Sequence, residues 1–168
     1  MIQLPIVPDF PKPGIQFIDI FPLFQTEEGR ADITAKFKAL TDVKVVAAPE
    51  ARGFILAGLM SVVNGASFIP FRKPGKLPTF TPAKVSYDTE YSTDTLEYRT
   101  EDIERCAAVS KEVYIVDDVL ATGGTAKAMA QALTEGGMTV KGFIFLAEVK
   151  ELPGRKLLEK IAPVNVLY

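Results

Sequence analysis

The sequence predicts an α/β fold with a central, mainly parallel sheet flanked by helices. Two strand–turn–helix units support this prediction, one from Val43 to Val63 and the other from Val113 to Leu133. In each unit a short apolar run, typical of a strand buried on both faces, precedes a helical pattern of apolar residues. Repeated β-α units place their strands side by side in one orientation, so a parallel sheet is expected.

Composition and length predict one domain covering residues 1–168. Hydrophobic residues make up 48% of the chain and charged residues 24%, as in ordinary soluble domains. The net charge of -2 gives no electrostatic case for binding nucleic acid, and no segment approaches membrane-spanning length. The first ten residues lack a signal-peptide pattern, and the single cysteine, Cys106, cannot form an internal disulfide. A cytoplasmic protein without a nucleic-acid or membrane partner is therefore expected.

The first 24 residues are rich in proline and phenylalanine. Prolines at this density exclude a regular helix, so we expect an ordered but irregular cover over the rest of the domain. A helical stripe of apolar residues follows from Asp32 to Leu40. The next unit has a strand over 43–48 and a helix from Ile55 to Val63, joined by a turn that contains Arg52 and Gly53. In that turn, Arg52 is either an anion ligand or an exposed side chain.

A third strand is expected over 66–71, followed by a basic turn. Arg72, Lys73 and Lys76 surround a Pro-Gly pair, and such a run is either a solvated loop or a clamp on a polyanion. Residues 79–100 alternate polar and apolar side chains, which predicts a hairpin-like excursion. This excursion has little continuous apolar surface, so we expect it to lie outside the core and to be mobile.

The segment from Glu112 to Thr125 carries the strongest functional pattern. A buried strand is followed at once by Asp117 and Asp118, then by a small-residue turn that opens a helix. Adjacent carboxylates suit ribose hydroxyls, or a Mg²⁺ ion bound partly through water. The protein has no histidine, so proton transfer must use Glu, Asp, Lys or Tyr.

The turn itself suits a phosphate group. Gly123 and Gly124 let the backbone approach an anion closely, and the helix N-terminus supplies unpaired N–H groups with partial positive charge. Thr122 and Thr125 add hydroxyl donors or cap the helix. A carboxylate pair beside a phosphate cradle predicts a phosphorylated sugar as ligand, in preference to a capped turn with two solvated acids.

The remaining segments complete the α/β pattern. Gly136 and Gly137 end the central helix, a strand is expected over 140–149, and a short helix after Pro153 leads to a final strand near 164–167. Cys106 lies in a helix that begins with acidic residues, and we expect a structural role for it.

Residues 115–125, Ile-Val-Asp-Asp-Val-Leu-Ala-Thr-Gly-Gly-Thr, resemble the phosphoribosyl pyrophosphate (PRPP) motif of type I phosphoribosyltransferases. The form found in adenine phosphoribosyltransferases is the most similar. Three further segments resemble the same family in the right order: residues 11–23, Ala51-Arg52-Gly53-Phe54, and the basic turn 72–78. The resemblance implies the type I phosphoribosyltransferase fold, with a small N-terminal hood over residues 1–24 and a flexible catalytic loop over 76–98.

The resemblance also implies site residues. Those matching the ribose and 5′-phosphate site are Asp117, Asp118, Ala121, Thr122, Gly123, Gly124 and Thr125. Those matching the pyrophosphate site are Ala51, Arg52, Arg72, Lys73 and Lys76. Those matching the purine site are Gln16, Phe17, Ile18 and Arg52, where Ile18 replaces the arginine usual in the family.

Residues 87–91, Tyr-Asp-Thr-Glu-Tyr, resemble the family's catalytic loop. Glu90 is then the residue that handles the proton on purine N7, and Tyr91 supports the loop. The resemblance further implies a Mg²⁺ cofactor, held mainly through PRPP and water with Asp117 and Asp118 as candidate ligands, and a homodimer. The implied reaction is transfer of 5-phosphoribosyl from PRPP to adenine, giving AMP and pyrophosphate. Transfer to another nucleobase, and a regulator that senses PRPP without catalysis, remain alternatives.

Overall fold

The computed structural model describes residues 2–10, 12–79, 81–88 and 93–168. A five-stranded sheet at its centre has the strand order β4-β3-β7-β8-β9, and every neighbouring pair in it is parallel. Its strands are β3 (Val45–Pro49), β4 (Ser67–Phe71), β7 (Glu112–Leu120), β8 (Thr139–Glu148) and β9 (Val164–Val166). The predicted parallel sheet is confirmed.

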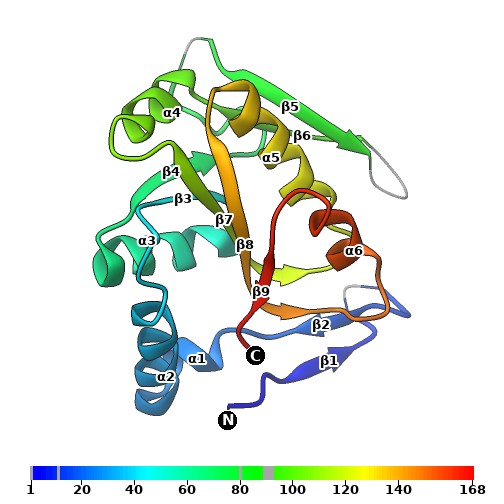
Figure 1. The fold of residues 1–168 in the computed structure, drawn as a ribbon. Coiled ribbons are helices and arrows are strands. Elements are labelled where there is room, and N and C mark those ends of the chain that lie inside the picture. The colour runs from blue at the N-terminus through cyan, green and yellow to red at the C-terminus, as the bar shows by residue number, and fades with distance from the viewer. Residues whose placement is uncertain (1, 11, 80, 89–92) are drawn as a thin grey trace.

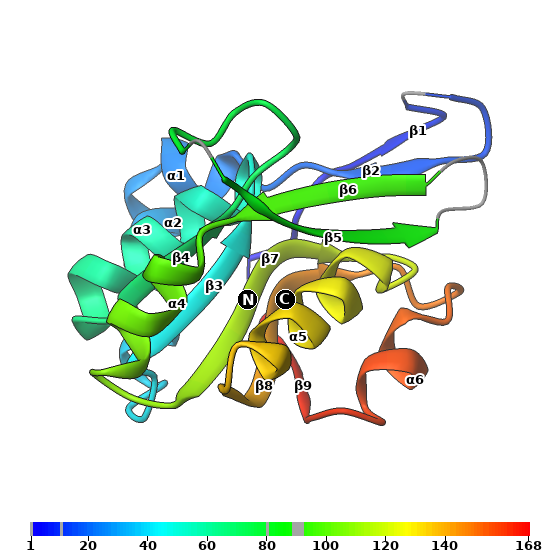
Figure 2. The same cartoon turned by 90° about the horizontal axis from the view of Figure 1, so that it is seen from above.

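Helices cover both faces of this sheet (Figures 1 and 2). On one face lie α2 (Glu27–Lys38) and α3 (Arg52–Asn64), and on the other lie α4 (Thr100–Ala107) and α5 (Gly124–Glu135). The short helix α6 (Gly154–Leu158) joins β8 to β9. Because both faces are covered, alternate residues of β3 enter different cores: Val46 and Ala48 pack with α2 and α3, whereas Val45 and Ala47 pack with α5.

The helix boundaries differ from the sequence prediction at two places. Helix α2 begins at Glu27, five residues before the expected start, because the Thr26 hydroxyl caps it by accepting a hydrogen bond from the Gly29 amide (3.0 Å). Helix α3 begins at Arg52, inside the segment predicted to be a turn. The predicted anion ligand therefore lies in the first turn of a helix.

The N-terminal segment has more regular structure than was predicted. Strands β1 (Ile6–Pro8) and β2 (Gln16–Ile18) form an antiparallel pair, and helix α1 (Pro22–Gln25) follows. The prediction that prolines exclude a helix here was wrong for α1. Pro22 occupies the first position of that helix, where an amide hydrogen has no intrahelical partner and its loss has no cost.

Strands β5 (Ala83–Asp88) and β6 (Thr93–Tyr98) form the predicted antiparallel hairpin. The expectation that this excursion would lie outside the core was wrong for its base. Val85, Leu96 and Tyr98 are buried in the same apolar cluster as α5 and β7, and the Tyr98 ring packs on Phe71. Val85 and Leu96 are directly paired across the hairpin, so their side chains lie on the same face and are buried together, although the hairpin has few apolar residues in total.

Candidate active site

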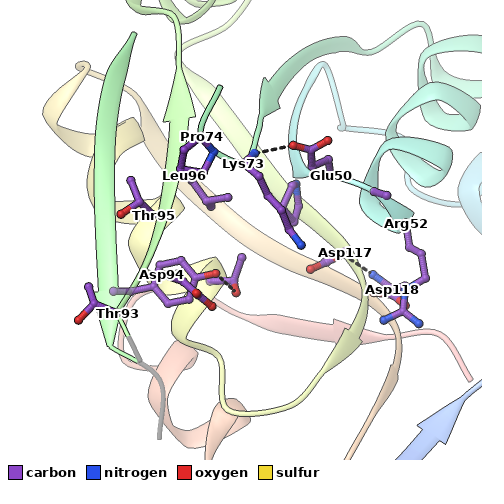
Figure 3. A pocket seen from close by; sticks show the side chains of 14 residues that line it. Glu50, Arg52, Lys73, Pro74, Thr93, Asp94, Thr95, Leu96, Asp117 and Asp118 are labelled. Carbon is purple, nitrogen blue, oxygen red and sulfur yellow. Dashed lines mark hydrogen bonds and ion pairs between the residues drawn. The ribbon is translucent and has the colours of Figure 1, made fainter. Parts of the chain in front are cut away.

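A cavity of about 660 Å³ lies at the carboxyl ends of β3 and β7, with the hairpin β5–β6 along its other side (Figure 3). Its lining combines residues from the loop after β4, the start of α3, the hairpin and the end of β7. The lining residues are Pro49, Glu50, Ala51, Arg52, Lys73, Pro74, Tyr87, Thr93, Asp94, Thr95, Leu96, Asp117, Asp118 and Thr125. The fold therefore brings four of the predicted segments to one cavity.

The two acids lie within β7, which continues past them to Leu120. The Asp117 Oδ1 atom accepts a hydrogen bond from the Asp118 amide (2.9 Å). Asp118 is only 4% exposed, and its Oδ2 atom lies 2.7 Å from Arg52 Nε. This contact is an ion pair without hydrogen-bond alignment, because the same Oδ2 atom has no hydrogen-bond partner among the described residues. Arg52 thus holds Asp118 in place, and both residues line the cavity.

The acid pair has an unfavourable electrostatic setting without a ligand. Burial, and then the neighbouring charge of Asp118, raise the pKa of Asp117 well above its usual value, although Arg52 acts in the opposite direction. Hydroxyl donors or a cation in the cavity would stabilise the ionised carboxylate of Asp117.

Gly53 allows α3 to approach the acid pair closely. A Cβ atom at this position would lie 3.1 Å from Asp117 Oδ1 and 2.9 Å from Pro49 Cδ. No side chain fits there without displacing its neighbours. The glycine in the Ala-Arg-Gly-Phe segment is therefore needed to bring Arg52 beside the carboxylates.

The phosphate-binding residues predicted from the sequence line a second, smaller hollow of about 80 Å³. Gly123 precedes α5 with a φ of +82°, a conformation that favours glycine, and Gly124 is the first residue of the helix. Residues 121–125 of this loop are all at least partly exposed, so their amides are not enclosed in the core. Asp117 and Thr125 line both this hollow and the larger cavity, so the two lie next to each other.

The basic turn after β4 is organised by Glu50, which the sequence prediction did not include. Its Oε2 atom accepts a hydrogen bond from Arg72 Nη2 (3.0 Å), and its Oε1 atom accepts one from the Lys73 amide. Burial alone would raise the pKa of Glu50, but these two donors lower it below its ordinary value. The sequence contained one indication of this role: Glu50 directly follows strand β3 and lies two residues before Arg52.

The three predicted cations of this turn have different surroundings. Lys73 lines the cavity, and its side chain extends toward Asp117 (Figure 3). Arg72 pairs with Glu50 and donates to the Lys76 carbonyl (2.7 Å), and neither Arg72 nor Lys76 lines the cavity. Arg72 therefore shapes the turn that presents Lys73.

Of the predicted purine residues, Phe17 has a direct contact with the cavity wall. The Arg52 guanidinium carbon lies 4.8 Å from the centre of the Phe17 ring. The Phe10 ring packs edge-on against the same Phe17 ring, with 5.2 Å between the ring centres. Gln16 is exposed, whereas Ile18 is buried and pairs with Ile6 in the hairpin β1–β2. Arg52 thus connects the N-terminal segment to the acid pair.

Tyr87 is a second cavity residue that the sequence prediction did not include. Thr125 Oγ1 donates a hydrogen bond to its phenolic oxygen (3.1 Å), which joins the hairpin to the loop of residues 121–125, predicted from the sequence to bind phosphate and called the phosphate loop below. Burial is the main cause that raises the pKa of Tyr87, so its hydroxyl stays protonated at neutral pH. Glu90 and Tyr91 lie outside the described residues, while Tyr87 and Asp94 on either side of them line the cavity.

Within the described ranges, no group of three or more His, Cys, Asp or Glu side chains is placed to hold a metal ion. No helix in the same ranges is long and apolar enough to cross a membrane. A protein-only metal cage is thus not formed by the residues described.

None of the protein-family models matches the chain. The adenine phosphoribosyltransferase of Francisella philomiragia is 46% identical to it over 160 residues, which cover 91% of this chain and 87% of that protein. The corresponding enzyme of Kosmotoga olearia is 42% identical over 155 residues, covering 90% and 88%.

Solved structures give the same result. The adenine phosphoribosyltransferase of Thermoanaerobacter pseudethanolicus superposes with a TM-score of 0.85 at 38% identity, covering 98% of this chain and 94% of that one. The Saccharomyces cerevisiae enzyme, complexed with an imino-altritol bisphosphate and adenine, has the same TM-score and coverage at 30% identity. The chain therefore belongs to the adenine phosphoribosyltransferase family and has the type I phosphoribosyltransferase fold.

Proposed function

We propose that the chain transfers the 5-phosphoribosyl group of PRPP to adenine, giving AMP and pyrophosphate, as in purine salvage. The observation that supports this most strongly is that the two hollows lie next to each other and share Asp117 and Thr125. A carboxylate pair and a lysine line the larger cavity, and a glycine loop at a helix N-terminus lines the hollow next to it. These groups match the diol, the pyrophosphate and the 5′-phosphate of PRPP.

The described residues suggest how the substrate is held. Asp117 and Asp118 both line the larger cavity, where their carboxylates accept the ribose hydroxyls. The amides and hydroxyls of residues 122–125 bind the 5′-phosphate. Lys73 stabilises the charge on the departing pyrophosphate, which grows as the bond from C1′ to the leaving oxygen breaks and the ribose gains oxocarbenium character. These contacts fix C1′ beside the attacking nitrogen of adenine.

The base loses one proton overall as the new C1′–N bond forms, and we assign that proton to Glu90. A carboxylate enclosed over the site can acquire the raised pKa that proton transfer needs. We expect Glu90→Gln to lower kcat by about 100-fold or more, while the Kd for PRPP stays near that of the unsubstituted protein. Equal losses of kcat and PRPP affinity would contradict the proton role.

Two adjacent carboxylates, with no third acid grouped around them for a metal among the described residues, fit a Mg²⁺ ion that takes most of its ligands from PRPP and water. Asp117 and Asp118 are the residues that would hold its hydration shell. When bound, the ion would neutralise charge on the pyrophosphate. Removing divalent cations with a chelator should therefore weaken PRPP binding, as measured by calorimetry.

A steady-state assay with PRPP and a panel of purines tests the reaction. Formation of AMP from adenine is the expected result. Turnover of a different base in place of adenine would show that the base preference is wrong. PRPP binding without turnover of any base would instead indicate a sensor of PRPP.

We also propose a homodimer formed through α3. This helix is apolar on all sides: Leu56, Ala57 and Met60 enter the core, while Ile55 and Val62 are exposed on its outer face. A helix that is hydrophobic all round is normally buried, so a second copy of the chain is the proposed cover.

The cytoplasm is the proposed compartment, in keeping with the buried free thiol of Cys106.

A further inference from the structure

The phosphate loop rests directly on the backbone at the start of α6. A Cβ atom built on Gly154 would lie 2.2 Å from the Ala121 carbonyl oxygen and 2.8 Å from Leu120 Cδ1. In the other direction, a Cβ atom on Gly123 would lie 3.1 Å from Gly154 Cα. The two backbones therefore touch with no side chain between them.

Helix α6 is fastened to the sheet independently of this loop. Arg155 Nε donates to Glu148 Oε2 at the end of β8 (2.7 Å), and Arg155 Nη1 donates to the Val164 carbonyl at the start of β9 (3.3 Å). Leu158 is fully buried in the core that contains α5. The short helix α6 is thus held in a fixed position, and the position of the loop packed on it depends on that helix.

We propose that Gly154 is a positioning residue for phosphate binding, with no ligand contact of its own. The groups that grip a phosphate at residues 122–125 are mainly backbone amides, so their position depends on what the loop backbone rests on. A side chain at Gly154 would push against Ala121, at the first residue of the loop, and displace the amides that follow it. The role of Gly154 in binding rests on the proposed function, in which residues 122–125 bind the 5′-phosphate of PRPP.

Gly29 provides a matched control, because a Cβ atom there would also clash with backbone atoms, while the residue does not line the cavity. A Cβ atom on Gly29 would lie 2.6 Å from the Leu23 carbonyl oxygen and 2.7 Å from Leu23 Cα. Both residues belong to the contact between α1 and α2. Gly29→Ala therefore reproduces the steric damage of Gly154→Ala without touching the phosphate loop.

The test compares Gly154→Ala with Gly29→Ala by thermal melting, PRPP calorimetry and steady-state kinetics. Both variants should melt at lower temperature. Gly154→Ala should raise the Kd and KM for PRPP by about 10-fold or more, with a much smaller change in the KM for adenine, because a displacement of about 1 Å is costly at such sites. Unchanged PRPP affinity in Gly154→Ala, or an equal loss in Gly29→Ala, would overturn the proposal.

Two further measurements cover the other outcomes. If Gly154→Ala does not fold, Arg155→Gln loosens α6 at its partly exposed anchor and should weaken PRPP binding several-fold; unchanged binding would refute the support role. Hydrogen exchange of the amides at 122–125 needs no ligand, and it should be faster in Gly154→Ala than in Gly29→Ala. Equal exchange rates in the two variants would also refute the support role. If the unsubstituted protein bound no PRPP, that result would refute only the proposed function.

Discussion

At the scale of single residues, Asp117 shows a conflict between stability and binding. Its carboxylate lies beside that of Asp118, and burial together with this neighbouring charge raises its pKa. A carboxyl group whose pKa is higher in the folded than in the unfolded protein gains protons on folding. Its ionised form therefore lowers the stability of the free protein at neutral pH, and the penalty fades as the pH falls toward the usual aspartate pKa.

Asp117→Asn should consequently stabilise the free protein while it damages the site. The amide oxygen can still accept the hydrogen bond from the Asp118 amide, but the charge is gone. We expect a gain of about 1 kcal/mol, or a rise in Tm of roughly 2–4 °C, at pH 7 without divalent cations. PRPP affinity should fall about 10-fold or more, since a charged acceptor is lost.

Scanning calorimetry from pH 7 to pH 4 checks this prediction. The advantage of Asp117→Asn should be largest at pH 7 and should shrink as the acid becomes protonated in the unsubstituted protein. A lower Tm for Asp117→Asn at pH 7 would contradict the electrostatic account of the pair.

At the scale of elements, Glu50 ties the end of β3 to the turn after β4. The pKa of Glu50 is shifted down, whereas that of Asp117 is shifted up, so the two acids affect stability in opposite directions. Ionised Glu50 stabilises the protein above the usual glutamate pKa, and this stabilisation is lost as the pH falls through the lowered pKa. Glu50→Gln should cost about 1 kcal/mol at pH 7, because two charge-assisted or backbone hydrogen bonds are weakened. Urea denaturation at pH 7 and at pH 3.5 measures the difference. A gap between the two proteins that persists at low pH would argue against this role.

The hairpin β5–β6 contributes to the core through its base. Leu96 is 4% exposed and packs in the apolar cluster shared with α5 and β7. Leu96→Ala should therefore lower the free energy of unfolding by about 2–4 kcal/mol, as for other buried leucines. Val109→Ala, at a position that is 58% exposed, should change it by less than about 0.5 kcal/mol. Similar effects of the two substitutions in urea denaturation would mean that the hairpin is not part of the core.

At the scale of the whole molecule, the uncovered side of α3 predicts an assembly. Val62, on the outer face, is 84% exposed, so a charge there would have little effect on a monomer but would oppose a second copy packed on it. Val62→Glu should halve the mass measured by sedimentation equilibrium, whereas Val109→Glu, at another exposed valine, should not change it. A mass that is the same for Val62→Glu and the unsubstituted protein would place any interface elsewhere.

Local sequence was sufficient for the parallel sheet and for the order of strand, acids, loop and helix beside the cavity. The apolar run before Asp117 and Asp118 predicts a strand buried on both faces, and Gly123 with Gly124 predicts a helix opening that accepts an anion. Strand, acids, loop and helix are consecutive in the chain. Their relative placement is therefore fixed by backbone geometry within a few residues.

Contacts between distant residues could be decided only by the tertiary structure. Glu50 and Arg72 are 22 positions apart, and Tyr87 and Thr125 are 38 apart, yet each pair is joined by a hydrogen bond at the cavity. Gly154 supports Ala121 through a backbone contact that leaves no hydrophobic or charge pattern in the sequence. The sequence by itself thus determined which charged and small residues follow each strand. The packing of separate β-α units determined which of them share one cavity, because such packing depends on shape over the whole core and not on neighbouring residues.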